Sequence, residues 1–396
     1  MSHFTLFSLL ASSALAADLY VSPEGTDSGT GSLDSPYASI QTAVDNAAAG
    51  DTIYLRGGTY TPTSNIQFTE KNGTADAPFT VTAYEGEEVT IDGEELEGTP
   101  AELGGSLANS DRGIFHIQGV EYWKFYNMTF INGPYGVYAR DASNNYYERL
   151  TTHDNYETGF QLEGASSNNQ VIYLDSYMNR DPRKNGESAD GFACKEGQGE
   201  GNVLRGARLW NNVDDGLDLW EFKSPVTVED VISYGNGFNR WDFTDFEGDG
   251  NGFKLGGGSD DEKGPAAHKV TNCISFGNAA KGFTDNKQPG DFVFTRNTAW
   301  NNNAVGFQTV SSTSSMTDNI AAANAGSTDN ADQVSLESTE TQGNSWEGSE
   351  TWSNSSFVSV DASLVQGARQ ADGRIQASDF LLPKSGDAIG ATTHWE

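Results

Sequence analysis

Asn212-Val213-Asp214-Asp215-Gly216-Leu217 is one copy of the repeat that decides the fold: an Asn, and four residues later a Gly followed by an apolar residue. Further copies of this length begin at Asn132, Asn155, Asn278 and Asn302. Two longer copies carry 8 and 12 extra residues between the Asn and the Gly: Asn179 to Gly191 and Asn236 to Gly252. Copies without an insertion are spaced 22 to 24 residues apart, and such a fixed period is typical of a solenoid.

Short runs of β-branched and aromatic residues precede these Asn residues, for example at 171–177, 226–234 and 292–300. Helical repeats would instead show apolar residues three and four apart over longer stretches. The sequence therefore predicts an all-β fold, a right-handed parallel β-helix solenoid of about ten coils. Asn tolerates the left-handed turn conformation, and its amide can bond to the same Asn one coil above. We therefore expect an asparagine ladder from Asn132 through Asn324.

The chain is interpreted as one elongated domain behind an export signal. Its 396 residues include 45 Gly and are only 36% hydrophobic, which suits a thin core with many turns. Residues 1–16 resemble a secretory signal peptide because an apolar stretch ends in Ala14-Leu15-Ala16. Residues 17–396 are then expected to form a single domain of a secreted, soluble protein. No other stretch has the roughly 20 apolar residues that cross a bilayer, so no membrane partner is predicted.

Both ends of a solenoid core need a cover. Residues 36–50 predict a short amphipathic N-terminal capping helix that ends at Gly50. Its apolar face would consist of Ile40, Ala43, Val44 and Ala47. After Asn324 the repeat fades, and residues 325–396 are expected to form degenerate coils and a C-terminal cap. The chain is expected to be a monomer, the default for a capped solenoid.

The two cysteines, Cys194 and Cys273, are not expected to pair. They occupy different positions in the repeat and lie about three coils apart, at about 4.8 Å per coil. That separation exceeds the Cα distance of about 7 Å that a disulfide can bridge. We expect two buried free thiols.

The net charge of −33 excludes nucleic acid as a partner. The cations are concentrated, since 14 of the 23 Lys and Arg residues fall between Arg180 and Arg296. This distribution is either chance scatter or a basic strip for a polyanion. Three insertions fall in the same region: Arg180 to Glu187, Gly237 to Asp249, and a segment between Leu255 and His268. Insertions in adjacent coils predict the walls of one groove.

Counting from the repeat Gly places charged residues in columns. The residues that precede it by one position are Asp190, Asp215, Asn251 and Lys281. Asp218 and Lys254 follow it by two. Equivalent positions on successive coils lie about 4.8 Å apart, so Asp190 is expected beneath Asp215 and Asp218 beneath Lys254.

Together with Asp214, these columns bring four carboxylates into one small region. Four carboxylates would repel one another and raise each other's pKa unless a cation is present. Hard oxygen ligands in this number, without Cys or His nearby, indicate Ca²⁺. The alternative is that these carboxylates merely face solvent on a very acidic protein.

Lys254 could be a simple ion-pair partner of Asp218, but a uronic acid substrate explains its position better. Abstraction of a proton next to a carboxylate builds charge on that carboxylate, and bound Ca²⁺ stabilises this charge. A lysine can be the base if burial and nearby positive charge lower its pKa. The product of such a β-elimination carries a C4=C5 double bond, and activity should rise at alkaline pH.

The central motifs resemble those of polysaccharide lyase family 9, whose best-known members are pectate lyases. The matching segments are Asp190-Gly191-Phe192-Ala193, Trp210 to Leu219, Tyr234 to Asn239 and Gly250 to Gly257. Residues 20–27 and 50–60 are similar to the start of that family, so the resemblance covers most of the mature chain.

The resemblance implies a right-handed β-helix that binds Ca²⁺ through aspartates and uses a lysine as the base. Carried over by motif, Lys254 becomes the catalytic base, and residues 17–396 become the catalytic domain. The implied calcium ligands are Asp190, Asp214, Asp215, Asp218 and a backbone carbonyl from Val213 or a neighbour. Lys195, Arg240 and Lys281 are weaker candidates for binding substrate carboxylates. The expected partner is an anionic polysaccharide, polygalacturonate (pectate).

Three alternatives stay open at this point. Some members of the family resemble lyases for rhamnogalacturonan or other polyuronides, on the same kind of site. Polygalacturonase-type hydrolases are also β-helices with paired aspartates, but their Gly-His-Gly motif is absent from this sequence. A non-catalytic β-helix adhesin or carbohydrate-binding protein would have no reason to place Lys254 among the aspartates.

Overall fold

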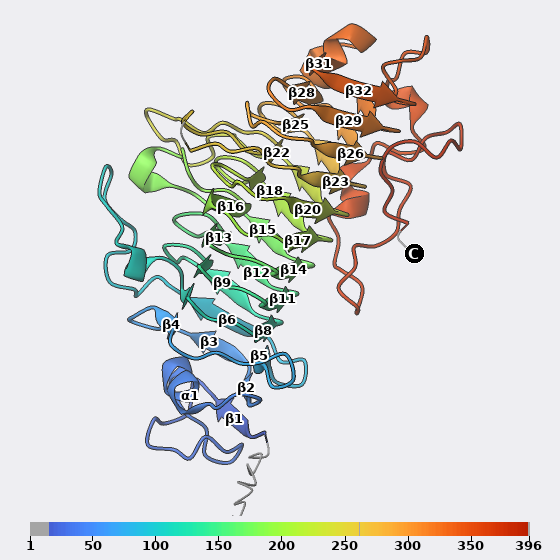
Figure 1. Cartoon of the computed structure of the whole chain (residues 1–396). Coiled ribbons are helices and arrows are strands. Elements are labelled where there is room, and N and C mark those ends of the chain that lie inside the picture. Colours follow the sequence, from blue (N-terminus) through green and yellow to red (C-terminus); the bar gives the residue numbers. More distant parts are fainter. Residues whose placement is uncertain (1–15, 261, 395–396) are drawn as a thin grey trace, which may run out of the picture.

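The protein, a computed structural model that describes residues 16–260 and 262–394, is an elongated stack of coils made of three parallel sheets (Figure 1). The predicted signal segment, residues 1–16, lies outside the described residues except for Ala16. We name the sheets for what they carry. The 10-stranded site sheet contains β4 (Ile66–Phe68), β7 (Phe115–Gln118), β10 (Val137–Arg140), β13 (Phe160–Gly164), β16 (Phe192–Gly197), β19 (Leu217–Asp218), β22 (Phe253–Lys254), β25 (Phe283–Thr284), β28 (Phe307–Thr309) and β31 (Val334–Leu336).

The other two sheets complete each coil. The 12-stranded long sheet contains β1 (Asp18–Val21), β2 (Thr52–Leu55), β5 (Phe79–Ala83), β8 (Trp123–Tyr126), β11 (Tyr146–Glu148), β14 (Gln170–Ile172), β17 (Asn202–Arg205), β20 (Val226–Glu229), β23 (Lys269–Thr271), β26 (Val293–Thr295), β29 (Ser314–Thr317) and β32 (Thr339–Gln342). The 10-stranded tail sheet contains β3 (Gly58–Tyr60), β6 (Val89–Asp92), β9 (Thr129–Ile131), β12 (Thr151–His153), β15 (Asp175–Tyr177), β18 (Arg208–Trp210), β21 (Ile232–Tyr234), β24 (Ile274–Phe276), β27 (Thr298–Trp300) and β30 (Ile320–Ala322).

Residues at equivalent positions on successive coils stack in columns, and these columns hold the coils in register. In the site sheet Leu217 pairs with Phe253, and Phe253 pairs with Phe283. The Phe253 and Phe283 rings stack at 4.5 Å between centroids inside the core. Because side chains alternate along a strand, the residue after each of these points to the outer face, and these outward positions include Asp218 and Lys254. The core column therefore fixes the position of the outward column.

The asparagine ladder is confirmed from Asn155 to Asn324. In each step the backbone N–H and the side-chain amide both donate to the Oδ1 of the next Asn, as at Asn212 and Asn236 (3.0 and 3.1 Å). The ladder ends on the side chain of Gln333. The ladder members are Asn155, Asn179, Asn212, Asn236, Asn278, Asn302 and Asn324.

Two details of the ladder prediction are wrong. Asn132 lies outside the ladder, because Gly133 occupies that position and donates its N–H to Asn155. The left-handed conformation belongs not to the ladder Asn but to the residue before it, as at Asn211 (φ 56°) and Asn301 (φ 54°). Two further sets of Asn stack at other turns: Asn145, Asn169 and Asn202 where the chain enters the long sheet, and Asn297, Asn319 and Asn344 after the long-sheet strands β26, β29 and β32.

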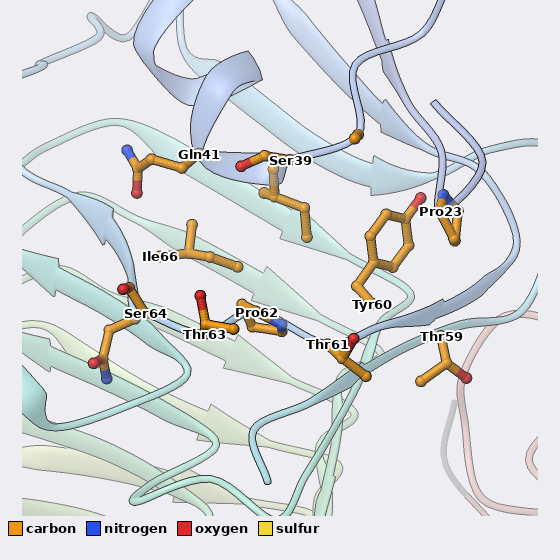
Figure 2. Close-up of a pocket in the computed structure, with 13 residues that line it drawn as sticks. Pro23, Ser39, Gln41, Thr59, Tyr60, Thr61, Pro62, Thr63, Ser64 and Ile66 are labelled. Carbon is orange, nitrogen blue, oxygen red and sulfur yellow. The ribbon is translucent and has the colours of Figure 1, made fainter. Parts of the chain in front are cut away.

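Helix α1 (Ile40–Asn46) covers the open end of the first coil but is shorter than the predicted 36–50. Ser39 accepts a hydrogen bond from the Thr42 N–H and so fixes the start, since residue 37 instead pairs with the backbone of β1. A cavity of about 400 Å³ lies between α1 and the loop 61–66 (Figure 2). Its lining, which includes Pro23, Gln41 and Tyr60, contains no charged side chain, so it is not the predicted site.

The C-terminal residues differ from the predicted cap. Trp346 does cover the end of the core, 5.3 Å from the Phe307 ring. The remaining chain runs back along the tail sheet, where Phe380 packs on Phe276. Arg369 from this segment forms an ion pair with Asp175 of β15. The tail thus covers one side of the solenoid as well as its end.

Short 3₁₀ helices occupy the connections: η1 (Asn109–Asp111), η2 (Pro182–Lys184), η3 (Asn324–Gly326), η4 (Asn330–Gln333), η5 (Asn354–Ser356) and η6 (Ala362–Val365). Cys194 and Cys273 are both buried free thiols, as predicted. Across residues 16–260 and 262–394, no helix is long and apolar enough to cross a membrane.

Candidate active site

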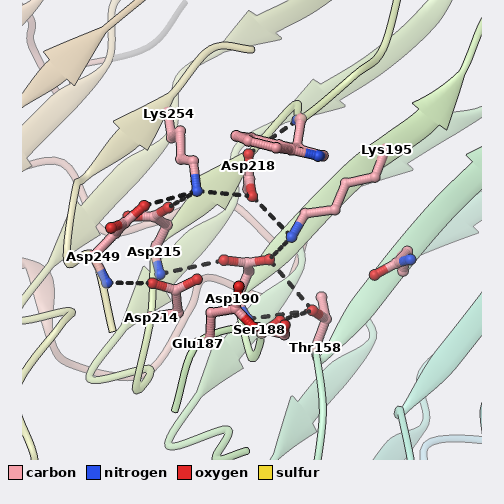
Figure 3. A network of polar contacts seen from close by, with 12 residues as sticks. Thr158, Glu187, Ser188, Asp190, Lys195, Asp214, Asp215, Asp218, Asp249 and Lys254 are labelled. Carbon is pink, nitrogen blue, oxygen red and sulfur yellow. Dashed lines mark hydrogen bonds and ion pairs between the residues drawn. The ribbon is translucent and has the colours of Figure 1, made fainter. Parts of the chain in front are cut away.

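The charged columns meet on the outer face of the site sheet (Figure 3). Asp218 pairs directly with Lys254 on the next coil, as the register predicts. The Asp215 N–H donates to Asp190 Oδ1 at 3.2 Å, which places these two aspartates on successive coils as well. The four predicted aspartates are all at most 1% exposed. The possibility that they merely face solvent is therefore wrong.

Lys254 Nζ lies at the centre of the cluster. Its distances to the nearest carboxylate oxygens are 2.9 Å for Asp249, 3.2 Å for Asp215 and 3.4 Å for Asp218. Its side chain is 8% exposed, and Nζ lies 5.3 Å from the centre of the Trp220 ring. The amine is thus buried against carboxylates on one side and an indole on another.

Lys195 enters the same cluster from β16. Its Nζ lies 2.7 Å from Asp190 Oδ2 and 2.8 Å from Asp218 Oδ2. Asp218 therefore bridges the two lysines through Oδ2, and its Oδ1 accepts the backbone N–H of Trp220 at 2.9 Å. Lys195 is fixed beside the aspartates.

Two buried carboxylate oxygens of the cluster have no hydrogen-bond partner among the described residues. They are the buried Oδ2 atoms of Asp214 and Asp215, although the latter lies within ion-pair distance of Lys254. The other oxygens are held in place: Asp214 Oδ1 accepts the Asp249 N–H, and Asp215 Oδ1 accepts the Asn251 backbone and side-chain amides. Asp214 Oδ2 thus has a fixed position and is available to a ligand, and Asp215 Oδ2 shares its environment with the Lys254 amine.

The arrangement suits a hard divalent cation. Two sets of carboxylates each have oxygens within 4.8 Å of one another, Asp190-Asp215-Asp218 and Asp214-Asp215-Asp249. All ligand atoms are oxygen, and five carboxylates face two ammonium groups, so negative charge is in excess. Calcium coordination takes six to eight oxygens, some of them carbonyls and waters. The residues present therefore fit Ca²⁺.

The excess negative charge perturbs the titration of the cluster. Burial raises the pKa of Asp190 to about 7 and, opposed by Lys254, the pKa of Asp215 to about 6. Burial, then Asp215, raises the pKa of Asp214 well above its usual value. Burial acts in the same direction on Asp218, but Lys195 and Lys254 outweigh it and lower that pKa.

The lysines respond in the opposite sense to burial. Burial lowers the pKa of Lys254, as expected for a base, but Asp218, Asp215 and the neighbouring carboxylates outweigh it and raise this pKa well above its usual value. The same balance with Asp190 and Asp218 raises the pKa of Lys195. In this arrangement both amines carry a proton, so a neutral Lys254 requires that positive charge offset the aspartates.

Two of the predicted insertions form a wall at the edge where the tail sheet leads into the site sheet. Segments 180–187 and 237–249 contact each other through the Glu247 N–H and the Asn185 carbonyl (3.1 Å). A third excursion, 93–113, was not predicted and joins the wall through the Gly104 N–H and the Arg183 carbonyl (2.8 Å) (Figure 1). The segment after Leu255 lies at the opposite edge and does not line the cavity at Lys254.

A cavity of about 390 Å³ opens above Lys254 beside this wall. The charged and aromatic side chains that line it include Lys195, Asp218, Trp220, Asp249 and Lys254. Of the predicted residues, Lys195, Asp218 and Lys254 line this cavity, whereas Asp190, Asp214 and Asp215 are buried in the adjoining cluster.

Some of the predicted residues do not line the cavity above Lys254. Arg240 donates to the Asn211 side chain and the Gly235 carbonyl at the outer turn, away from the cavity lining. Lys281 stacks above Asn251 through its backbone, and it does not line the cavity. The Val213 carbonyl lies against Gly248 of the wall.

The sequence interpretation missed two residues. Asp249 brings a fifth carboxylate from the wall, and the only signal was its place two residues before Asn251 in the Lys254 motif. Trp220, two residues after Asp218, provides the aromatic surface.

The comparisons agree with this fold. The sequence model of the family described as "Pel9A-like, right handed beta helix region" matches residues 19–324. The chain therefore belongs to this family, the pectate lyase-like enzymes of polysaccharide lyase family 9. The right-handed β-helix and the polysaccharide lyase class are both confirmed.

Particular relatives cover nearly the whole chain. The sequence is 65% identical to pectate lyase PEL9 of Emericella nidulans over 98% of both chains. It is 32% identical to pectate lyase L of Dickeya chrysanthemi, over 94% of this chain and 85% of that one. The crystal structure of pectate lyase Pel9A matches with a TM-score of 0.78 and 31% identity, covering 95% of this chain and 91% of that one. A rhamnogalacturonan lyase at 24% identity has the same fold.

Proposed function

We propose that this polysaccharide lyase is secreted, cleaves polygalacturonate by β-elimination and depends on Ca²⁺, with Lys254 as the base. The observation that carries the proposal is the position of Lys254 Nζ within 3.4 Å of three carboxylates, beside two buried carboxylate oxygens without a hydrogen-bond partner in the described part of the chain. The 65% identity to a pectate lyase favours polygalacturonate over other polyuronides.

The calcium ligands in this proposal are Asp190, Asp214, Asp215 and Asp218, with Asp249 and the Val213 carbonyl as further oxygen donors. A bound Ca²⁺ would supply positive charge against the substrate carboxylate on which charge develops. Asn251 orients Asp215, and Asp249 orients Asp214 through its N–H. These contacts hold the oxygens in place before any ion arrives.

Lys254 removes the proton from C5 of the uronate, and the electron pair forms the C4=C5 double bond as the C4–O bond breaks. The amine forms an ion pair with Asp218 on the coil below, which holds it in the site. Trp220 covers the amine and presents an indole face on which a sugar ring can stack. Lys195 is held beside Asp190 and is placed to bind a substrate carboxylate.

Ultraviolet absorbance of the unsaturated product tests the proposal. Wild type and Lys254→Ala are incubated with polygalacturonate, in Ca²⁺ and in chelator, and rhamnogalacturonan is the comparison substrate. Absorbance from polygalacturonate that requires both Ca²⁺ and Lys254 is expected. Equal absorbance in chelator would contradict the calcium dependence, and product from rhamnogalacturonan alone would change the substrate.

A further inference from the structure

A second cavity of about 130 Å³ continues from the cavity at Lys254 along the wall. Four residues line both cavities: Lys184, Ser188, Lys195 and Glu196. The remaining lining consists of Arg112, Tyr135 and Gln161, which come from coils nearer the N-terminus, and Arg183, which precedes Lys184 in the wall. The two cavities are therefore parts of one groove over the site sheet, and the second part is not explained by the elimination chemistry.

Arg112 has unused hydrogen-bonding capacity in this second cavity. Both of its side-chain hydrogen bonds to described residues come from Nη1, to Tyr138 Oη at 3.4 Å and Glu163 Oε2 at 3.3 Å. Its Nε is buried and has no hydrogen-bond partner in the described part of the chain. The guanidinium also lies over the Tyr138 ring, 5.5 Å from its centre. The group is held in place with donors to spare.

The other charges of this cavity are already paired, with one exception. Arg183 is bonded through Nε and Nη2 to Glu157. Glu163 is shared by Arg140, Gln161 and Arg112. Lys184 donates to Ser188. Glu196 is the exposed acid at the junction with the Lys254 cavity. Among the described residues that line this cavity, Arg112 is therefore the arginine that keeps donors for an anion.

The position fits a second unit of the same polysaccharide. Arg112 contacts Glu163 of β13, three strands before β22 in the site sheet. Strands in a sheet lie about 4.8 Å apart, so this contact is about 14 Å from the level of Lys254. That distance is longer than a single pyranose residue. A ligand that reaches both places has to be a chain of several sugars.

We infer that this cavity is a remote subsite in which Arg112 binds the carboxylate of a uronate several residues away from the bond that is cleaved. The inference rests on the proposed function, since it takes a polyuronide as the ligand. An arginine guanidinium forms strong charge-assisted hydrogen bonds with a carboxylate, and the Nη2 of Arg112 makes no hydrogen bond to a described residue. Tyr135 and Gln161 line the same cavity beside it.

Calorimetric binding tests the subsite without catalysis. Trigalacturonate and hexagalacturonate are titrated in Ca²⁺ into protein that carries Lys254→Ala, with and without Arg112→Gln. A charge-assisted hydrogen bond contributes about 1.5 to 3 kcal/mol, so Arg112→Gln is expected to weaken hexagalacturonate binding about tenfold or more. Trigalacturonate binding is expected to stay within twofold. Equal losses for both ligands, or no loss for the longer one, would overturn the subsite.

Arg205→Gln is the matched control, since Arg205 is an exposed arginine paired with Glu229 on the long sheet. Glu163 keeps Arg140 and Gln161 when Arg112 is replaced, so the fold has support. If Arg112→Gln does not fold, Arg112→Lys is the second variant, since it retains the charge but loses the planar guanidinium. It should still weaken hexagalacturonate binding severalfold. Unchanged affinity of this variant would overturn the inference. Failure of wild type to form unsaturated product refutes the lyase proposal alone, because this binding difference does not depend on turnover.

Discussion

The asparagine ladder and the aspartate cluster are two buried polar columns built by the same coil repeat, and they behave in opposite ways. In the ladder, Asn236 donates to Asn278 and accepts from Asn212, so each amide is satisfied by a copy of itself. In the cluster, Asp190 and Asp215 stack as like charges, and Asp215 Oδ2 finds no hydrogen-bond partner within residues 16–260 and 262–394. When the same residue recurs one coil above, two amides can hydrogen-bond to each other because each has a donor and an acceptor. Two ionised carboxylates in the same arrangement repel each other.

The difference shows what each column does. A satisfied buried network rigidifies a structure, whereas a buried group left unsatisfied costs free energy. The ladder is therefore expected to stabilise the fold. The cluster is expected to destabilise it, because its carboxylates are arranged for the reaction and not for hydrogen bonding to one another. Substitutions that remove the chemistry, or that convert one column into the other, test this comparison.

The largest effect is expected from removing the amine at the centre of the cluster. Lys254→Ala should lower kcat on polygalacturonate by about 10²- to 10⁴-fold, the usual contribution of a general base. Product absorbance measures the rate, and Lys269→Ala is the control because Lys269 is an exposed lysine on the long sheet. A Lys254→Ala enzyme that keeps more than a tenth of wild-type kcat would exclude this residue as the base.

The next effect converts the ladder into a cluster. Asn236→Asp places a carboxylate between the Asn212 and Asn278 amides, removes the donor to Asn278 and buries an uncompensated charge. The free energy of unfolding should fall by about 3 to 5 kcal/mol at pH 7, measured by denaturant titration.

The control for this change is Asn301→Asp. Asn301 is exposed and has a left-handed conformation that Asp tolerates, so the cost should be within about 0.5 kcal/mol. Similar losses for both variants would mean that stacking in the ladder contributes nothing particular.

A smaller effect, of opposite sign, is expected in the cluster. Burial raises the pKa of Asp214 above its unfolded value, so its ionisation opposes folding as pH rises through the folded pKa. Asp214→Asn removes this cost while its amide oxygen can still accept the Asp249 N–H. In chelator at pH 7 the variant should be more stable than wild type by about 1 to 3 kcal/mol.

Thermal unfolding with and without Ca²⁺ measures how much stability wild type and Asp214→Asn each gain from the ion. Wild type should gain more stability from Ca²⁺ than Asp214→Asn, because the variant has lost a charged ligand. Asp76→Asn, at an exposed carboxylate, should change neither condition. A variant that is less stable than wild type in chelator would show that Asp214 stabilises the fold without an ion.

The parts of the site that lie on the repeat could be predicted from the sequence. The spacing from the repeat Gly placed Asp218 against Lys254 because coil stacking leaves no freedom in register. The same count failed at Asn132, where one residue fewer separates the ladder position from the Gly. Other stacked Asn, such as Asn145 and Asn169, were missed because neither is followed by a Gly four residues later.

Residues on insertions could not be predicted in the same way. Asp249 and Arg240 belong to one inserted segment, yet the first enters the cluster and the second lies at the outer turn. The path of such a segment depends on its contacts with other insertions, such as the one between Glu247 and Asn185. These contacts join parts of the chain that the repeat does not relate.

The smallest expected effect comes from His268, a buried residue with one ring nitrogen hydrogen-bonded, as in the ladder, and the other unpaired within the described structure, as in the cluster. Its Nδ1 accepts the Val226 N–H at 3.1 Å, as a ladder amide would, while its buried Nε2 has no partner among the described residues. Burial lowers the pKa of His268 to about 3, so the folded protein keeps the ring neutral while the unfolded chain protonates near its ordinary value of 6.5. The stability from the neutral ring is therefore present above pH 6.5 and is lost as pH falls toward 3, by about 1.4 kcal/mol for each unit. His268→Gln cannot protonate, so the difference in unfolding free energy between it and wild type should change by that amount from pH 6 to pH 5; a difference that does not vary with pH would show that His268 is protonated in the fold.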